Sequence, residues 1–368
     1  MLIGRRSMVG TGLALAAAPG LAAGGLKPTI KRLYGRAIVI NGNLGGPFFE
    51  ERRLTFAEVA EIRSSGLTAA KVTLGGDGMD RATTLAQLRR LERTIDVNRD
   101  VFMRIGKTAD LISAKRSGLV GLIPSFEGGS MLEGRVDAID AFRSLGVLVM
   151  GLSYNRRTPF GSGVLDPWSI GLTSLGREAV ARMNALGVTV DVSHSDESTG
   201  LQAIEASRQP VLVTHAGSSA VHAHPRNKSD RLIRALSERG GVFGLYELTF
   251  IAGNDHQQSL SDYMAHLDHL LNVAGEDHVG VGSDAAIGRF DTSAASMSAW
   301  DADIARRRAA GVGAPGEGRP PFVTELNRAD RMELIAAALA SRGYRARVIE
   351  KVLGGNFERV FSETWLQG

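Results

Sequence analysis

The sequence predicts an α/β protein whose strands close into a (β/α)8 barrel of the TIM type. Eight short β-rich runs alternate with segments of helical spacing from about residue 36 onward. The runs are apolar over nearly their whole length, which is typical of parallel strands buried on both faces. Eight such units in one chain most simply close into a barrel. The expected strands are Ala37–Asn41, Ala69–Leu74, Leu119–Ser125, Val147–Ser153, Val188–Ser193, Pro210–Thr214, Val242–Tyr246 and His278–Ser283.

The segments between these runs carry the signals of helix ends. Thr55 and Glu58 form a capping-box pattern at the start of one helix. Another helix places Val180 and Met183 on one face and ends before Gly187. Most of the 45 glycines fall at the ends of apolar runs, where turns need their backbone freedom. The chain is therefore expected to fold into many short elements.

A doubly wound open sheet is the competing arrangement, and its usual signal is missing. The first run is followed by Asn-Gly-Asn-Leu-Gly at residues 41–45, not by a Gly-x-Gly-x-x-Gly turn that leads into a helix. The Gly- and Pro-containing residues 310–321 predict a surface loop before the final helices, not a linker. Because the sequence has no internal repeat, we expect residues 30–368 to form a single catalytic domain.

Composition narrows the possible partners and sites. The formal net charge is only +4, and no basic run is interleaved with aromatic residues, so nucleic acid is not an expected partner. There is no cysteine, which excludes disulfides, thiolate zinc sites and a cysteine nucleophile. Any bound metal must therefore be held by His, Asp and Glu.

The first 25 residues have the composition of a secretory signal peptide. Arg5 and Arg6 precede an apolar stretch of small residues from Met8 to Ala23, and the paired arginines suggest the twin-arginine route. An uncleaved membrane anchor is the alternative, although the stretch is shorter than the roughly 20 residues that a span needs. No later segment could span a bilayer. The mature protein is therefore expected in the periplasm or outside a bacterial cell.

Four polar residues follow the expected strands at equivalent positions. They are Glu127, His194, His215 and Asp284, after the third, fifth, sixth and eighth runs. The carboxyl ends of barrel strands meet at one face, which is where such barrels hold their active sites. Two imidazoles and a carboxylate suit Zn²⁺, and an aspartate opposite them could accept a proton from a metal-bound water.

Four further histidines are weaker candidates for a metal site. His266 and His269 lie on an expected helix over Ser261–Val273 and are interpreted as packing or solvent-facing residues. His256 lies in a polar loop, and His278 precedes the last strand, at the opposite end of the barrel.

At these residues the chain resembles the membrane (renal) dipeptidase family of metallopeptidases, peptidase family M19, from the first strand to nearly the last residue. The motifs that carry the resemblance are Phe-Glu-Gly-Gly around Glu127, Gly-Leu-Thr-Ser-Leu-Gly-Arg-Glu from Gly171, Asp-Val-Ser-His from Asp191, Val-Thr-His from Val213, His-Pro-Arg-Asn from His224, Glu-Arg-Gly-Gly-Val from Glu238, Val-Gly-Val-Gly-Ser-Asp from Val279 and Gly-Gly-Asn-Phe-Glu-Arg-Val from Gly354.

The resemblance implies a (β/α)8 barrel with two zinc ions that hydrolyses free dipeptides. It implies that Glu127 bridges both metals and that His194 and His215 hold the second one. Asp284 would serve the reacting water and the leaving amine. Arg226, with Asn227 beside it, would bind the substrate carboxylate, which a planar guanidinium can grip through two hydrogen bonds.

The chain departs from the family pattern at two places. Where the family has the His and Asp that hold the first metal, this chain has Asn43 and Gly45. Glycine offers no ligand and an amide oxygen binds zinc weakly, so the first metal is expected to be absent or loosely held. Where the family has a histidine near the oxyanion, this chain has Tyr154, whose hydroxyl could donate a hydrogen bond from a longer arm without a positive charge.

Two hypotheses of function follow. The first is a dipeptidase, or an amidase of related small substrates, with one zinc on Glu127, His194 and His215; one zinc with an open position can activate water unaided. The second is a catalytically impaired homologue that binds a peptide or small carboxylate without cleaving it. A different reaction on the same scaffold also remains open, as does a homodimer.

Overall fold

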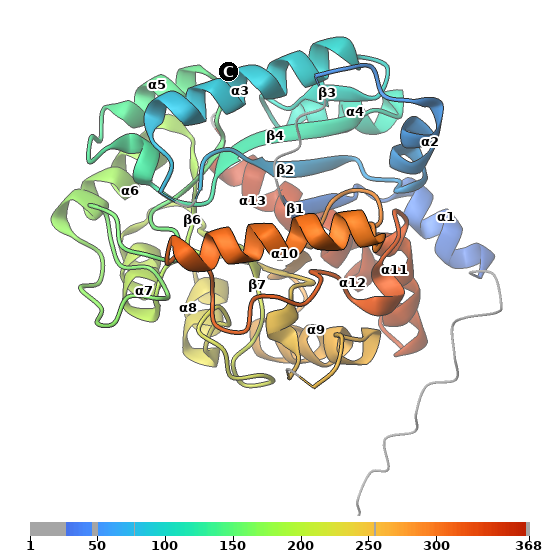
Figure 1. Ribbon diagram of the computed structural model, residues 1–368. Coiled ribbons are helices and arrows are strands. Elements are labelled where there is room, and N and C mark those ends of the chain that lie inside the picture. Colours follow the sequence, from blue (N-terminus) through green and yellow to red (C-terminus); the bar gives the residue numbers. More distant parts are fainter. Residues whose placement is uncertain (1–26, 46–50, 77, 254, 366–368) are drawn as a thin grey trace, which may run out of the picture.

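Eight parallel strands close into a barrel that helices surround (Figure 1). The computed structural model describes residues 27–45, 51–76, 78–253 and 255–365. Neighbouring strands pair in the order β2-β1-β9-β8-β7-β6-β5-β4, and the pairing of β2 with β4 closes the ring. The barrel strands are β1 (Ile40–Leu44), β2 (Ala69–Thr73), β4 (Val120–Phe126), β5 (Val149–Gly151), β6 (Thr189–Asp191), β7 (Leu212–Ala216), β8 (Val242–Leu245) and β9 (Val279–Val281).

All eight expected strands are present, and one further short strand was not predicted. Strand β3 (Phe102–Arg104) pairs with the first half of β4, on the edge where β5 pairs with the second half. Three residues are too few to show a periodic pattern, and of these only Phe102 is buried. The expected barrel is therefore confirmed, with β3 as an extra strand beside it.

Strands β1 and β7 end later than predicted, and each contains an irregularity near its end. On β1, the three steps from Asn41 to Leu44 match two steps on β2; on β7, the three steps from Val213 to Ala216 match two on β8. Such bulges redirect side chains and are common next to active sites. The prediction that the first strand ends at Asn41 is therefore wrong, and His215 lies inside β7 instead of after it.

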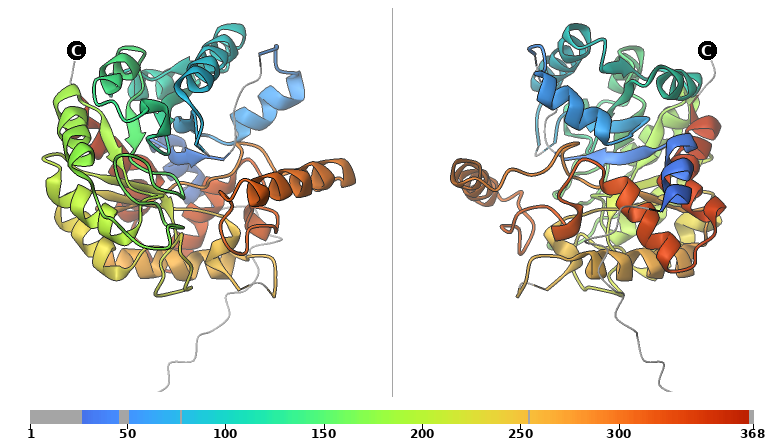
Figure 2. Two further views of the ribbon diagram at one scale, coloured as in Figure 1. Left: turned by 60° about the vertical axis from the view of Figure 1, so that its left-hand side comes forward. Right: turned by 90° about the vertical axis from the view of Figure 1, so that its right-hand side faces the viewer.

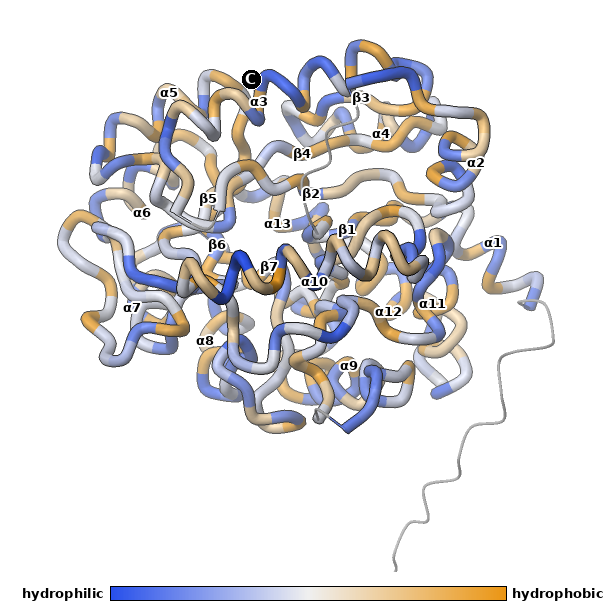
Figure 3. The backbone as a smooth tube through the Cα atoms, viewed as in Figure 1, coloured by the Kyte–Doolittle hydropathy of each residue, from blue (hydrophilic) through white to orange (hydrophobic). Residues whose placement is uncertain are grey.

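The surrounding helices follow the capping signals of the sequence. Thr55 and Glu58 form the expected capping box, and Gly187 ends its helix in the left-handed conformation with φ of 66°. Figure 3 shows hydrophilic and hydrophobic residues alternating along outer helices such as α3. The helices are α1 (Pro28–Arg36), α2 (Phe56–Ser64), α3 (Arg81–Val97), α4 (Ala109–Ser117), α5 (Ala138–Ser144), α6 (Ser174–Leu186), α7 (Glu197–Ala206), α8 (Asp230–Glu238), α9 (Leu260–Ala274), α10 (Ala294–Ala309), α11 (Arg331–Ser341), α12 (Ala346–Glu350) and α13 (Asn356–Thr364).

Helix α13 closes the amino-terminal end of the barrel. Phe357 and Phe361 pack in one buried cluster with Ile40, Leu148 and Leu212 from the barrel strands. This end of the barrel is therefore a packed apolar core, which leaves the opposite end for polar chemistry.

The carboxyl end of the barrel lies beneath helix α10 and the segment that follows it. Figure 2 shows α10 standing outside the ring of helices. Residues 310–321, predicted as a surface loop, lie over the barrel mouth, and Ala314 in this segment is buried. The segment is thus part of the wall of the site.

Two further predictions concern membranes and export. In the part of the chain that the structure describes, no helix is long and apolar enough to cross a membrane. The predicted signal peptide, residues 1–25, lies outside the described residues.

Candidate metal centre

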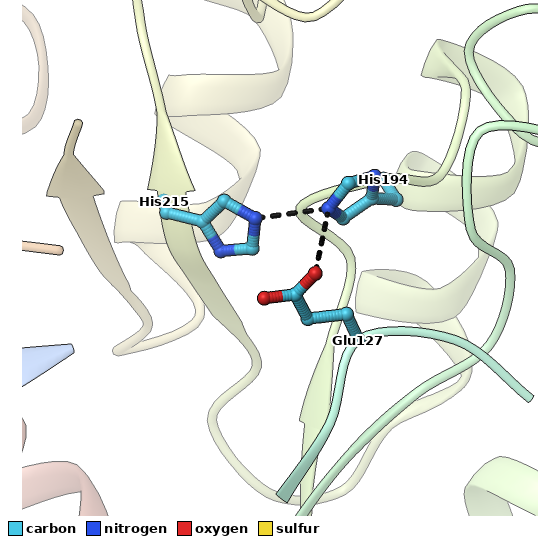
Figure 4. A group of neighbouring side chains, drawn as sticks. All are labelled: Glu127, His194 and His215. Atoms are coloured by element: carbon cyan, nitrogen blue, oxygen red, sulfur yellow. Dashed lines mark hydrogen bonds and ion pairs between the residues drawn. The ribbon is translucent and has the colours of Figure 1, made fainter. Parts of the chain in front are cut away.

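Three of the four predicted strand-end residues converge at the carboxyl end of the barrel (Figure 4). Glu127 directly follows β4, His194 follows β6, and His215 lies near the end of β7. One ligand atom from each lies within 4.8 Å of the others, and all three side chains are buried. The structure therefore brings together the ligand set that the sequence predicted.

Hydrogen bonds on the far side of each ring leave both Nε2 atoms as acceptors. His194 Nδ1 lies 2.9 Å from Asn155 Oδ1, which can only accept a proton. His215 Nδ1 lies 2.9 Å from the Thr214 hydroxyl, and that hydroxyl donates its own proton to Asp191 at 2.6 Å. Both rings therefore carry their proton on Nδ1. Such bonds orient metal-binding histidines.

Both imidazoles are held neutral. Burial, followed by the charge of Arg226, lowers the pKa of His194 to about 3. Burial is also the main cause that lowers the pKa of His215 well below its ordinary value. Burial acts to raise the pKa of Glu127, and with both imidazoles neutral it is the nearby Lys71 ammonium that acts to lower this pKa and favours the ionised carboxylate. Neutral imidazoles and an ionised carboxylate are the forms that bind a divalent metal.

The three residues fit a divalent cation. His194 Nε2 lies 2.9 Å from His215 Nε2 and 3.4 Å from Glu127 Oε2. With their protons on Nδ1, two nitrogen lone pairs and a carboxylate oxygen face one another in a buried place. That arrangement is repulsive by itself, and a cation between the three atoms would satisfy all of them.

The second oxygen of Glu127 is held by protein hydrogen bonds. Glu127 Oε1 accepts from Asn43 Nδ2 at 2.7 Å and from the Thr73 hydroxyl at 2.6 Å. The Asn43 amide also donates to Asp284 Oδ1 at 2.9 Å, and its oxygen accepts from Lys71 Nζ at 2.5 Å. Asn43 therefore presents N–H groups, not its oxygen, to Glu127.

The residues that would hold a first metal do not fit one. A Cβ added at Gly45 would lie 2.2 Å from the backbone oxygen of Asp284, so no side chain has room there. The Asn43 side-chain oxygen, which could at best be a weak metal ligand, accepts a hydrogen bond from Lys71 Nζ instead. Among the described residues, only Glu127, His194 and His215 form a group of three metal-ligating side chains.

Asp284 accepts a hydrogen bond from Asn43 and has a strained backbone conformation. Its φ is 53°, a left-handed conformation that is uncommon for residues other than glycine, and its backbone N–H donates to Asn43 O at 3.0 Å. Burial, followed by the charge of Glu127, raises the pKa of Asp284 to about 7. Asp284 is thus suited to exchange a proton near neutral pH.

A cavity of about 520 Å³ opens onto this cluster. Glu127, His194 and Asp284 lie at its walls, together with Tyr154 and Arg226 and residues from helix α10. The volume suits a small ligand.

Of the three predicted substrate-binding residues, Arg226 and Tyr154 line this cavity and Asn227 does not. Arg226 Nη1 donates to Ser193 O at 2.6 Å, and Nη2 lies 3.2 Å from His194 Nε2. The Tyr154 ring stacks on His194 with centroids 4.1 Å apart. Asn227 is absent from the described cavity wall, and its amide bonds His222 O, Phe250 O and the Tyr246 hydroxyl. Substrate contact by Asn227 stays a prediction.

Sequence reasoning missed the residues that support the ligands. Asn155 and Thr214 orient the two imidazoles, and Lys71 and Thr73 bond the Asn43 side of the cluster. One signal was available: Lys71 is a lone charge inside an apolar strand, and such a residue needs a buried partner. The others could be found only from the structure.

The four histidines predicted to be weaker candidates lie outside the cluster. His266 is buried and accepts from Ser218 N, while His269 lies 2.7 Å from Asp230. His256 pairs with Asp255 and Asp262, and His278 bonds Gly241 O.

Known proteins resemble this chain in sequence and in fold. A family model described as membrane dipeptidase (peptidase family M19) matches residues 60–298. An uncharacterized protein in the pqqA 5′ region of Klebsiella pneumoniae is 28% identical over 269 residues, 70% of this chain and 88% of that protein. Dipeptidase tcpJ of Claviceps purpurea (strain 20.1) is 25% identical over 283 residues, 76% of this chain and 59% of that protein.

Among solved structures, an amidohydrolase from Pseudomonas aeruginosa matches with a TM-score of 0.77 and 26% identity, over 91% of this chain and 99% of that one. Its fold agrees with the barrel described above. The chain belongs to the membrane dipeptidase family, peptidase family M19, a family of metal-dependent hydrolases that act on peptide bonds.

Proposed function

We propose that this metal-dependent dipeptidase cleaves small dipeptides or related amides with one zinc ion held by Glu127, His194 and His215. The observation that carries the proposal is the 2.9 Å approach of two imidazole Nε2 atoms whose protons lie on Nδ1, beside Glu127 Oε2. A zinc ion bound there would make water nucleophilic at neutral pH and polarise the substrate carbonyl. A binding-only homologue is not favoured, because the chain belongs to a family of metal-dependent dipeptidases and keeps Glu127, His194 and His215.

Asp284 is proposed to carry the proton of the reaction. It accepts a proton from the water whose oxygen bonds to the carbonyl carbon. It returns this proton to the nitrogen as the C–N bond breaks, so that the carboxyl ends unchanged and the products are an acid and an amine. Its place on the wall of the cavity that Glu127 and His194 also line supports this role.

Arg226 and Tyr154 are proposed to position the substrate. Arg226 is buried at the cavity wall, where its guanidinium suits a terminal carboxylate. The Tyr154 hydroxyl could donate to a developing oxyanion, and Arg307 Nη2 lies 3.5 Å from that hydroxyl. This guanidinium supplies a positive charge near Tyr154 that the tyrosine itself lacks.

The test is release of amino acids from a panel of dipeptides by purified protein with added Zn²⁺. We expect activity that EDTA abolishes and Zn²⁺ restores, and loss of at least about 100-fold in kcat/KM in His194→Ala, His215→Ala and Asp284→Asn. Asp284→Asn should still bind the ion, whereas His194→Ala should not. The matched control is His269→Ala, a histidine outside the cavity, which should keep full activity. Full activity in both His194→Ala and His215→Ala would remove the metal from the mechanism.

A further inference from the structure

We propose that the Lys71 ammonium is the resident cation on the Asn43 side of Glu127, and that the centre therefore takes one divalent ion and not two. This inference rests on the proposed function, which puts that ion on Glu127, His194 and His215. Lys71 acts here as a positioning residue, through Asn43.

Lys71 is a charge buried inside the barrel. Its side chain is fully buried on β2, between Ala70 and Val72. Its Nζ lies 2.5 Å from Asn43 Oδ1 and 3.8 Å from Asp191 Oδ2. A buried ammonium is stable only where nearby groups compensate the loss of its hydration. Asn43 and Asp191 are the groups that do so for Lys71.

The ammonium decides which way the Asn43 amide points. Lysine offers three donors and no acceptor, so the amide must turn its oxygen toward Nζ. Its NH₂ group then faces the two carboxylates and donates to Glu127 Oε1 at 2.7 Å and to Asp284 Oδ1 at 2.9 Å. A group that presents hydrogens in this direction cannot also ligate a metal there.

The two carboxylate oxygens of Glu127 consequently have different partners. Its Oε1 is occupied by the Asn43 amide and the Thr73 hydroxyl, while its Oε2 faces His194 Nε2 at 3.4 Å. Only Oε2 is directed at the imidazole pair. Glu127 is therefore placed to bind one ion through one oxygen.

The backbone around Gly45 also leaves no room for the side chain of a further metal ligand at that position. Gly45 N donates to Ala285 O at 3.2 Å, and a Cβ on Gly45 would meet the Asp284 backbone at 2.2 Å. The ammonium would in addition repel a second divalent ion at close range. Gly45 therefore supplies no ligand, so an ion on this side could be held only by Asn43, Glu127 and Asp284, and only if the ammonium were removed.

The test is the number of Zn²⁺ ions bound per chain, measured on wild-type protein by calorimetric titration after chelation and by elemental analysis after dialysis. We expect one ion in the wild type. Lys71→Gln should bind a second ion at least about tenfold more weakly than the first, because the amide is then free to turn its oxygen toward the carboxylates. Thr73→Val is the matched control: it removes a hydrogen bond to Glu127 but keeps the ammonium, and should stay at one ion.

The outcomes separate this inference from the proposed function. No bound ion in the wild type would sink the proposed function, whereas two ions would leave metal-dependent hydrolysis in place and overturn the single-ion centre and the role of Lys71. A folded Lys71→Gln that still binds one ion would overturn it as well. If circular dichroism shows that Lys71→Gln does not fold, Asn43→Asp is the second test. The Lys71 ammonium should pair with the new carboxylate, so this variant should still bind one Zn²⁺ ion per chain. Two bound ions would contradict the inference.

Discussion

At the residue scale, Glu247 is a buried carboxylate outside the candidate metal centre. It follows β8, it is fully buried, and neither of its carboxylate oxygens has a hydrogen-bond partner among the described residues. Arg331 Nε lies 3.8 Å from Oε1, within ion-pair distance but too far for a hydrogen bond. Burial raises the pKa of Glu247 to about 7, although Arg331 opposes the shift. This residue should therefore make stability depend on pH.

We expect Glu247→Gln to remove that dependence. The folded pKa lies above the ordinary value of 4.5, so the folded chain keeps a proton that the unfolded chain has lost. The stability is complete below about pH 4.5 and is lost as pH rises through about 7. At pH 8 the variant should be more stable by about 1–3 kcal/mol, and at pH 4.5 nearly equal.

The measurement is urea unfolding of metal-free protein at both pH values, so that metal affinity does not contribute. Glu363→Gln, on the exposed face of α13, is the control and should change stability by less than about 0.5 kcal/mol. Equal stability of wild type and Glu247→Gln at pH 8 would contradict the assignment.

At the scale of elements, helix α13 supports the strands that carry the site. The Phe357 ring is fully buried, and it occupies the space where Cβ atoms on Gly42 and Gly280 would lie, 2.4 and 2.5 Å from ring carbons. Glycine is thus required on β1 and β9 for the helix to dock this closely. Gly42 is also the neighbour of Asn43, so the packing of this ring affects the strand that reaches Glu127.

We expect Phe357→Ala to destabilise the protein by about 3–5 kcal/mol, because a large cavity would remain beneath β1 and β9. Urea unfolding measures the change. Phe56→Ala is the matched control: Phe56 is 91% exposed, so its removal should cost less than about 0.5 kcal/mol. A loss below about 1 kcal/mol for Phe357→Ala would mean that α13 does not support the barrel.

At the scale of the whole molecule, export remains a prediction, because residues 1–25 lie outside the part of the chain that the structure describes. Arg5 and Arg6 and the apolar stretch after them are its basis. We expect a reporter fused after residue 30 to appear in the bacterial periplasm, and Arg5→Lys with Arg6→Lys to reduce export strongly. Cell fractionation measures the distribution, and a reporter without residues 1–25 is the control. Retention of the intact fusion in the cytoplasm would exclude export by this segment.

The sequence by itself determined the barrel and the ligands of the candidate centre. The apolar composition of the runs predicts strands that are buried on both faces. Glu127, His194 and Asp284 follow such strands, and His215 lies near the end of one. The sequence also shows Asn43 and Gly45 at the positions where the family has two ligands of its first metal.

Only the tertiary structure decided how these residues act on one another. The Lys71–Asn43–Glu127 chain joins three strands, and its residues lie 28 and 84 positions apart in the sequence. The Nδ1 protons of the imidazoles depend on Asn155 and Thr214, which no sequence period marks. A strand pattern specifies which side chains face the barrel interior, but distances between strands depend on how the barrel closes and where its bulges lie.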